Sequence, residues 1–329
     1  MKVLIVGCGA VGQVYGLCLQ KAGVELGLND QPAVVERLRQ AQGQGGLPLF
    51  QITRAHRQDP LPRQLQNYQV LANPAECRRF QPDQIWFATP SMVYYTRAFQ
   101  DFVQQVPSQR VVCFAPEGRR PEFLPGISPE RLVFGGTTFL AWQGDLQGGG
   151  GRKEGINFWL TPLGIQLSGT KAACRPVQQL LQQAGFRTAA AGPDSTMQAV
   201  VTAGMTAFVA GLELSGWSLR GYRRGPWLAS AARAAREAVL GELPAAGRSS
   251  AALLGTPLFR AGFSLAARTL PRLFPFDLEK YLRFHYSKTH DQTLTLLSIF
   301  LSDANSRGLP AADLQHLREA LARPGSPRL

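Results

Sequence analysis

The sequence is short of the residue patterns that mark secreted and metal-binding proteins. Its 329 residues include five cysteines and four histidines, and no two cysteines form a CxxC pair. A zinc site needs clustered ligands at defined spacings, which are missing here. The cysteines instead stand in apolar runs such as residues 111–114. We therefore expect reduced thiols in the core and no metal site.

Long uncharged segments are also scarce. The longest, residues 195–212, contains Ser, Gln, Thr and Gly and is followed by Glu213. It is too short and too polar for a membrane span, so we expect a buried helix. The sequence runs from Lys2 directly into an apolar segment, without the basic region, long apolar stretch and cleavage site of a secretory signal. We therefore expect a cytoplasmic protein.

Lysine is missing between Lys171 and Lys280, although the chain carries a formal net charge of +13. Residues 215–272 hold nine arginines against two acids, Glu237 and Glu242. This segment has no RNA-binding motif with interleaved aromatic residues and no recognisable DNA-reading helix, so we expect no nucleic-acid partner. A solvated basic face is the preferred interpretation, and a contact with acidic phospholipid headgroups is the alternative.

Strands and helices alternate in the first half of the chain, which predicts a parallel sheet. With 45% hydrophobic and 17% charged residues, the chain is long enough for two domains. Helices are expected up to residue 22 and around residues 34–41. The candidate strands are residues 2–6, 24–28, 68–71, 84–88, 110–115 and 131–134.

The remaining segments suggest where the sheet ends. Residues 45–62, rich in Gly, Pro and Gln, are expected to form an irregular excursion or a hairpin. Four glycines at 148–151 predict a flexible loop, and residues 157–160 and 165–167 are expected in edge hairpins. Strand patterns stop near residue 192 and helical patterns follow. We therefore predict a dinucleotide-binding domain at 1–191 and an all-helical substrate or dimerisation domain at 192–329.

A glycine turn at the start of the chain carries the strongest functional signal. Gly7, Gly9 and Gly12 directly follow an apolar strand and open a helix. The first glycine makes the turn, the second lets the backbone approach a diphosphate, and the third lets helix and strand pack closely. A purely structural turn is the alternative. The expected cofactor-binding residues of this turn are Gly7, Cys8, Gly9, Ala10, Val11 and Gly12.

Asp30 lies 18 residues beyond Gly12, at the end of the second strand. A carboxylate there accepts hydrogen bonds from a ribose 2′-hydroxyl and repels a 2′-phosphate, so it favours NAD over NADP. Arg37 and Arg39 follow and keep NADP open as the alternative. Ligands of such sheets collect at the carboxyl ends of the strands. Further candidates at that edge are Thr89, Pro90 and Glu117, with Ser91 and Thr137 as weaker ones whose hydroxyls suit ordinary loop hydrogen bonds.

The chain resembles the ketopantoate reductase family over nearly its whole length. The segments that carry the resemblance are KVLIVGCGAVGQVYG at 2–16, VFGGTTFLA at 133–141, LGIQLSG at 163–169 and ANSRGLPAADLQHL at 304–317. The resemblance implies a Rossmann domain, that is, a doubly wound parallel sheet of the α/β class, followed by an all-helical domain. It also implies hydride transfer from a nicotinamide to the carbonyl of a 2-oxo acid in the cleft between them.

The chain departs from the family pattern at four places. Asp30 stands where members usually carry an Arg for NADPH, and Glu117-Gly118 stands for an Asn-Gly pair. The segment after the fourth strand, residues 88–91, lacks a usual Lys. The helix at 195–214 lacks the family's catalytic Lys and the Asn residues that follow it. A non-catalytic dinucleotide-binding sensor or partner-binding protein is therefore the alternative to an enzyme.

One segment offers a replacement for the missing acid. Asp277 is expected to cap a long helix in which Tyr281, His285, Lys288 and Gln292 fall at i, i+4, i+7 and i+11, on one face. These four are the candidate catalytic residues. Lys288 would bind a substrate carboxylate while His285 or Tyr281 polarises the carbonyl. A solvated polar stripe is the alternative.

Together these features predict an NAD(P)H-dependent reductase of the ketopantoate-reductase-like class that acts on a small anionic carbonyl compound. The sequence is compatible with a homodimer. Membrane-surface contact through the arginine-rich segment, near the apolar Trp217, Trp227 and Leu228, is a further alternative.

Overall fold

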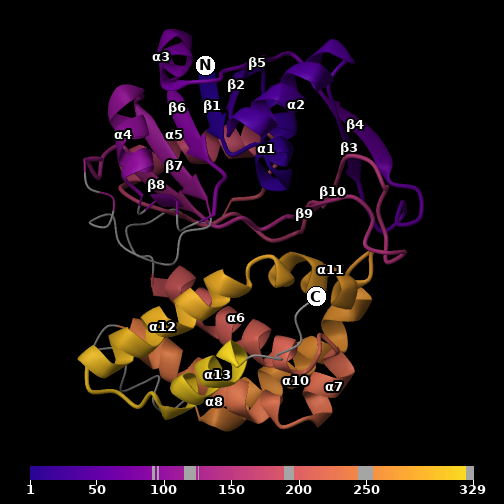
Figure 1. Ribbon diagram of the computed structural model, residues 1–329, viewed down its shortest axis with the longest axis vertical. Helices are drawn as coiled ribbons and strands as arrows, with labels where there is room; N and C mark the ends of the chain where they lie inside the picture. The colour runs from indigo at the N-terminus through magenta and orange to yellow at the C-terminus, as the bar shows by residue number, and fades with distance from the viewer. Residues whose placement is uncertain are drawn as a thin grey trace. The chain divides into compact units, whose positions relative to one another are not determined.

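A computed structural model describes residues 1–90, 93–94, 96–114, 124, 126–188, 196–243 and 255–323. The chain divides into two units (Figure 1). The first comprises Met1–Asp145 and Gly151–Ser195, and the second comprises Leu146–Gly150 and Thr196–Leu329. The boundary predicted at residue 192 lies outside the described residues.

The first unit is built on a seven-stranded sheet. Its order is β11-β8-β7-β6-β1-β2-β5, and all neighbouring strands are parallel except β11, which pairs antiparallel with β8. The predicted parallel sheet is therefore confirmed. The strands are β1 (Lys2–Val6), β2 (Glu25–Asn29), β5 (Tyr68–Val70), β6 (Gln84–Phe87), β7 (Arg110–Phe114), β8 (Leu132–Gly135) and β11 (Leu167–Ser168).

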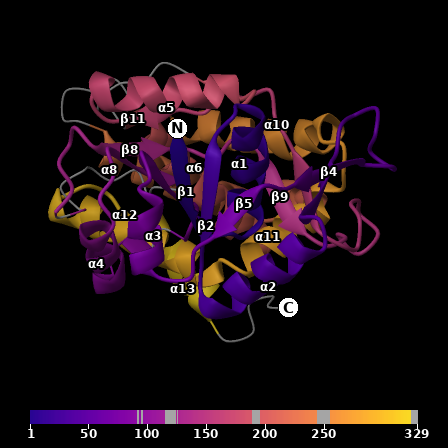
Figure 2. The same ribbon diagram turned by 90° about the horizontal axis from the view of Figure 1, so that it is seen from above.

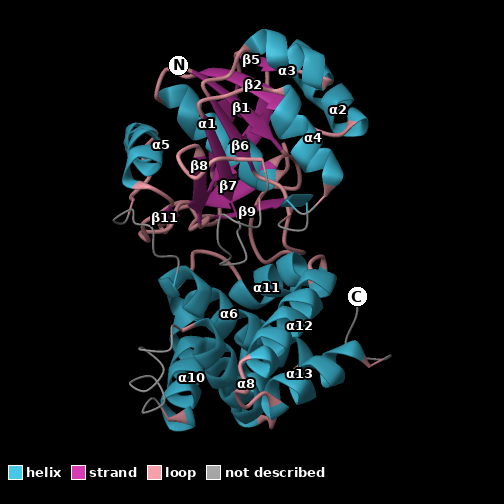
Figure 3. Ribbon diagram, turned by 90° about the vertical axis from the view of Figure 1, so that its left-hand side faces the viewer, coloured by secondary structure: helices cyan, strands magenta, loops and turns pink. Residues whose placement is uncertain are grey.

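Helices cover both faces of this sheet because its strands are apolar on both sides. Val3 and Ile5 of β1 pack into a core with α1 (Ala10–Lys21) and α5 (Lys171–Gln183), whereas Leu4 packs into a second core with α3 (Pro74–Phe80) and α4 (Arg97–Gln105). Figure 3 shows these helix pairs on opposite sides of the sheet. The helix α2 (Pro32–Gly43) follows β2. The doubly wound α/β arrangement predicted from the sequence is confirmed.

A second, four-stranded sheet has the order β4-β3-β10-β9. The strands β3 (Leu47–Gln51) and β4 (Leu61–Leu65) pair antiparallel, so the excursion at 45–62 contributes to a hairpin. Residues 157–160, expected in an edge hairpin, contribute to β10 (Ile156–Trp159), which pairs antiparallel with the edge strand β9 (Leu140–Gln143). The strand β10 is itself interior, because it also pairs with β3. Its side chains Ile156, Asn157 and Phe158 are buried, which suits an interior strand.

Helix α1 lies between the two sheets (Figure 2). A Cβ atom at Gly16 would lie 3.1 Å from Leu65 Cδ2 of β4 and 3.2 Å from Leu26 Cδ2 of β2. The helix is therefore clamped on two sides, which fixes the position of its N-terminus.

The second unit is described by helices α6 (Thr196–Leu214), α7 (Leu219–Arg224), α8 (Trp227–Glu242), α10 (Thr256–Leu273), α11 (Leu278–Ser287), α12 (His290–Ser306) and α13 (Ala312–Ala322). Its core includes alanines of α6 and α8, whose small side chains let two helices approach closely. The uncharged segment at 195–212 contributes to α6, which is buried along much of its length as predicted. Within the described residues, no helix has the length and apolar character that crossing a membrane requires.

All five cysteines are buried and free of disulfide bonds. Burial raises the pKa of Cys18 and Cys174 to about 11, so these thiols stay protonated at neutral pH. The prediction of reduced core cysteines is confirmed. No group of three potential metal ligands is found in the described part of the chain.

Candidate functional site

The glycine turn begins where three strands of the first unit end. Gly7 follows β1 with φ of +95°, and its amide donates to the carbonyl of Asn29 at the end of β2 over 3.0 Å. A Cβ atom at Gly7 would lie 2.7 Å from Ala88 O, just beyond β6. Both the left-handed backbone and the lack of space require glycine at this position.

Gly12 is required for a different reason. A Cβ atom there would collide with the carbonyl oxygen of Gly7 and would lie 3.3 Å from a methyl group of Ile5. The first turn of α1 therefore rests directly on the backbone of the strand that precedes it. This contact is the close helix–strand packing expected of the third glycine in the motif.

Gly9 is the glycine that the fold does not need. It is the N-cap of α1 with an ordinary φ of −71°, and a Cβ atom there would meet nothing within 4 Å. No side chain caps this end of α1, and its first turn holds no acidic residue. The first amides of a helix have no partner within the helix and attract anions. The open space beside Gly9 and the uncapped amides therefore fit a diphosphate.

Asp30 follows β2 directly and lies against this turn. Its Oδ2 atom accepts a hydrogen bond from the amide of Cys8 over 2.5 Å, and its Oδ1 atom accepts one from the amide of Gln31 over 2.7 Å. Burial, reinforced by the Asp30 charge, raises the pKa of the Cys8 thiol, which stays protonated. Arg37 and Arg39 are exposed on α2.

Thr89 completes the described part of this edge. A Cβ atom at Gly7 would lie 2.8 Å from the Thr89 methyl group, and the Thr89 hydroxyl is buried without a hydrogen-bond partner. A buried hydroxyl without a partner is unusual and invites a ligand atom. Pro90 is exposed, and Thr137 approaches the Tyr15 hydroxyl at 3.5 Å. Glu117 and Ser91 lie outside the described residues.

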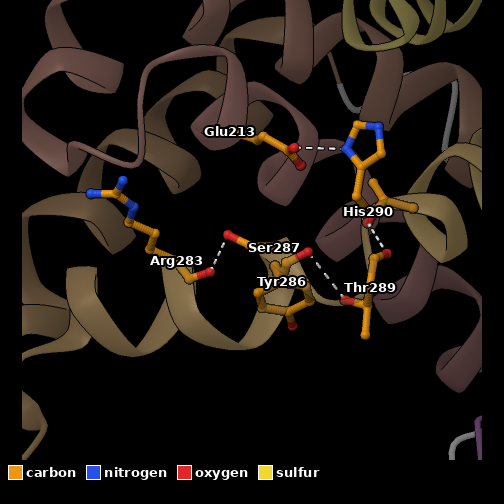
Figure 4. A network of polar contacts seen from close by, with 7 residues as sticks. Glu213, Arg283, Tyr286, Ser287, Thr289 and His290 are labelled. Carbon is orange, nitrogen blue, oxygen red and sulfur yellow. Dashed lines mark hydrogen bonds and ion pairs between the residues drawn. The ribbon is translucent and has the colours of Figure 1, made fainter. Parts of the chain in front are cut away.

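The single helix predicted to carry Tyr281, His285, Lys288 and Gln292 is wrong. Helix α11 ends at Ser287 with Lys288 as its C-cap, and α12 begins at His290. The hydroxyls of Ser287 and Thr289 donate to the carbonyls of Arg283 and Tyr286 (Figure 4).

The break separates the four candidate residues into different environments. The buried Tyr281 ring stacks on His285 with centroids 5.5 Å apart and planes at 13°. Lys288 is exposed, with its Nζ atom 3.6 Å from the Phe284 ring centroid, and Gln292 belongs to α12. Only Asp277 acts as predicted, since its side chain accepts from the amide of Lys280 and caps α11.

Burial sets the protonation of the first two groups. It lowers the pKa of His285, with a further contribution from the Lys288 charge, and it raises the pKa of Tyr281. His285 is therefore neutral at pH 7, and Tyr281 keeps its proton. Burial also lowers the pKa of Lys288.

Glu213 and His290 form a carboxylate–imidazole pair in the second unit, which we did not predict from the sequence. Glu213 Oε1 lies 2.7 Å from His290 Nδ1, and the two side chains are 2% and 13% exposed. The Nε2 atom of His290 is buried and has no hydrogen-bond partner. Figure 4 shows Glu213 reaching the imidazole from another helix. The one available signal was a carboxylate at the end of an otherwise uncharged helix.

Comparisons with known proteins agree with the fold. Residues 3–141 match the model of the family described as ketopantoate reductase PanE/ApbA, which confirms the resemblance drawn from the sequence. No curated protein matches the chain.

Solved structures share the fold over almost the whole chain. D-mandelate dehydrogenase with NADH and anilino(oxo)acetate is 17% identical, with a TM-score of 0.64 and coverage of 98% of this chain and 97% of that one. A probable 2-dehydropantoate 2-reductase from Bacillus subtilis is 12% identical, with a TM-score of 0.63 and coverage of 98% and 99%. A dimeric ketopantoate reductase from Staphylococcus aureus is 12% identical, with a TM-score of 0.58 and the same coverage.

The different surroundings of two glycines give a matched test of the turn. We expect Gly9→Ala to leave the free energy of unfolding within about 1 kcal/mol of the parent, because only an N-cap preference is lost. Its methyl group occupies the space beside the helix end, so NADH affinity should fall at least about tenfold, or 1.4 kcal/mol.

Gly12→Ala is the contrasting variant. We expect it to lower the unfolding free energy by about 3 kcal/mol, because its methyl group collides with backbone. Urea titration and calorimetry with NADH measure both quantities. Unchanged NADH binding by folded Gly9→Ala would contradict a diphosphate at this position.

Proposed function

Because residues 3–141 belong to the ketopantoate reductase family, we propose that the chain is an NAD(P)H-dependent reductase acting on the carbonyl of an anionic 2-oxo acid or a similar small substrate. The observation that carries this proposal is the vacant space at Gly9 beside the uncapped start of α1. The nicotinamide cofactor, when bound, supplies the hydride.

The residues of the turn would hold that cofactor. The amides of Ala10 and Val11 would face the diphosphate, and Asp30 would accept hydrogen bonds from a ribose. The buried Thr89 hydroxyl would gain a partner that it otherwise lacks. Gly7 and Gly12 would act indirectly, by fixing the position of the helix end.

Asp30 leads us to propose NAD as the preferred cofactor. Its carboxylate already accepts from the amide of Cys8, so a 2′-phosphate would approach a fixed negative charge. The exposed Arg37 and Arg39 make NADP the alternative.

Replacing Asp30 tests this preference. We expect the parent protein to bind NADH more tightly than NADPH. In Asp30→Asn, the dissociation constant of NADPH divided by that of NADH should fall about tenfold, because the charge that repels the 2′-phosphate is removed. Glu25→Gln, at the exposed start of the same strand, is the control and should leave the ratio unchanged. Tighter binding of NADPH by the parent would reject the proposed preference.

Carbonyl reduction also requires a proton or a positive group at the developing oxyanion. We propose His290 as the proton donor and Glu213 as the residue that orients it. With Glu213 on Nδ1, the Nε2 atom is left to carry the transferred proton. The alternative remains the predicted set of Tyr281, His285, Lys288 and Gln292, in which Lys288 binds the substrate carboxylate and His285 or Tyr281 polarises the carbonyl.

Two histidine variants separate these mechanisms. We expect His290→Gln to reduce kcat by about 10²–10⁴-fold, the usual range for loss of general acid catalysis, while His285→Gln retains most activity. Glu213→Gln removes the carboxylate that holds Nδ1, so kcat should also fall, while NADH affinity should stay at the parent value. A large loss in His285→Gln with normal His290→Gln would favour the predicted set instead.

The activity itself is tested by following NADH oxidation with a panel of 2-oxo acids. We expect turnover with at least one of these acids. In Gly9→Ala, turnover at a fixed NADH concentration should fall along with the affinity for NADH. Tight NADH binding without turnover on any compound would favour the alternative of a non-catalytic sensor. We also propose a homodimer, which light scattering would detect.

A further inference from the structure

Four arginines converge on one groove within the second unit. The groove has a volume of about 440 Å³. Arg220 and Arg223 reach it from α7, and Arg268 and Arg272 reach it from α10. The dinucleotide candidates all belong to the first unit, so this groove is built from a separate set of residues.

The groove contains little negative charge to balance the arginines. Glu279 is the one acid among its lining residues, and its Oε1 atom already accepts from the amide of Leu219 over 2.7 Å. Within the described part of the chain, none of the four arginines forms an ion pair. Glu279 is therefore the one fixed negative charge beside four positive charges in the groove.

Helix stability does not explain this arrangement. Arg223 and Arg272 lie in the last turns of their helices, where a positive charge is favourable. Arg220 is the second residue of α7 and Arg268 lies in the middle of α10, so neither gains from a helix end. The pairs are spaced i, i+3 and i, i+4, at which like charges repel. A bound anion would relieve this repulsion.

We propose that this groove binds the phosphate group of a small molecule. Guanidinium groups form paired, charge-assisted hydrogen bonds with phosphate oxygens, and four of them suit a multiply charged group better than a single carboxylate. The volume lies in the range of small-molecule sites. A free phosphorylated compound and a phospholipid headgroup present the same chemistry to the groove.

Inorganic pyrophosphate is a suitable probe. The experiment uses the full chain carrying Gly9→Ala, so that the glycine turn does not contribute, and keeps ionic strength constant with NaCl. We expect calorimetry to detect pyrophosphate binding, and Arg220→Gln with Arg268→Gln to weaken it at least tenfold. The matched control is Arg224→Gln with Arg260→Gln, which removes one exposed arginine from each helix outside the groove.

The pattern across the two double variants decides the outcome. Selective loss in the groove variant supports the proposal, whereas equal loss in both variants reduces the effect to general surface charge and overturns it. Absence of pyrophosphate binding also overturns it. Thermal unfolding without pyrophosphate checks that both variants are folded. A second experiment measures sedimentation with vesicles that contain phosphatidic acid. If the parent protein sediments with them and the Arg220→Gln, Arg268→Gln variant does not, a lipid headgroup is the source of the phosphate. No vesicle binding would identify a free compound.

Discussion

The contact between the backbone of Gly7 and the first turn of α1 sets the geometry of the first unit. It exists because Gly12 has no side chain and because Gly7 adopts a left-handed backbone at the meeting point of three strands. This contact brings the end of α1, Asp30 and Thr89 to one edge of the sheet. A larger residue at either glycine would separate these groups, so the candidate site depends on a packing requirement of the fold.

The chain divides its polar chemistry between its two units. The first offers uncapped helix amides, a carboxylate and a buried hydroxyl without a partner at one edge of its sheet, which suit a dinucleotide. The second holds the buried Glu213–His290 pair and a groove of arginines. A carboxylate near the end of α6 holds an imidazole from α12 within the second unit.

Local signals were sufficient to predict most of the first unit. The glycine spacing, the apolar strands and Asp30 each depend on residues close together in the sequence, and all are found where expected. The interior position of β10 depends on pairing with β3, about 100 residues away, which periodicity cannot reveal. The end of α11 at Ser287 and the start of α12 at His290 interrupt a spacing that by itself fits one continuous helix. Glu213 and His290 are 77 residues apart in the sequence, and no sequence motif predicts their contact.

The most direct measurement of the central claim is a crystal structure of the chain grown with NADH. We expect the diphosphate against the amides of Ala10 and Val11, with the adenosine ribose within hydrogen-bond distance of Asp30 and a cofactor atom on the Thr89 hydroxyl. A nucleotide bound elsewhere, or a glycine turn whose amides face only solvent at saturating NADH, would contradict it.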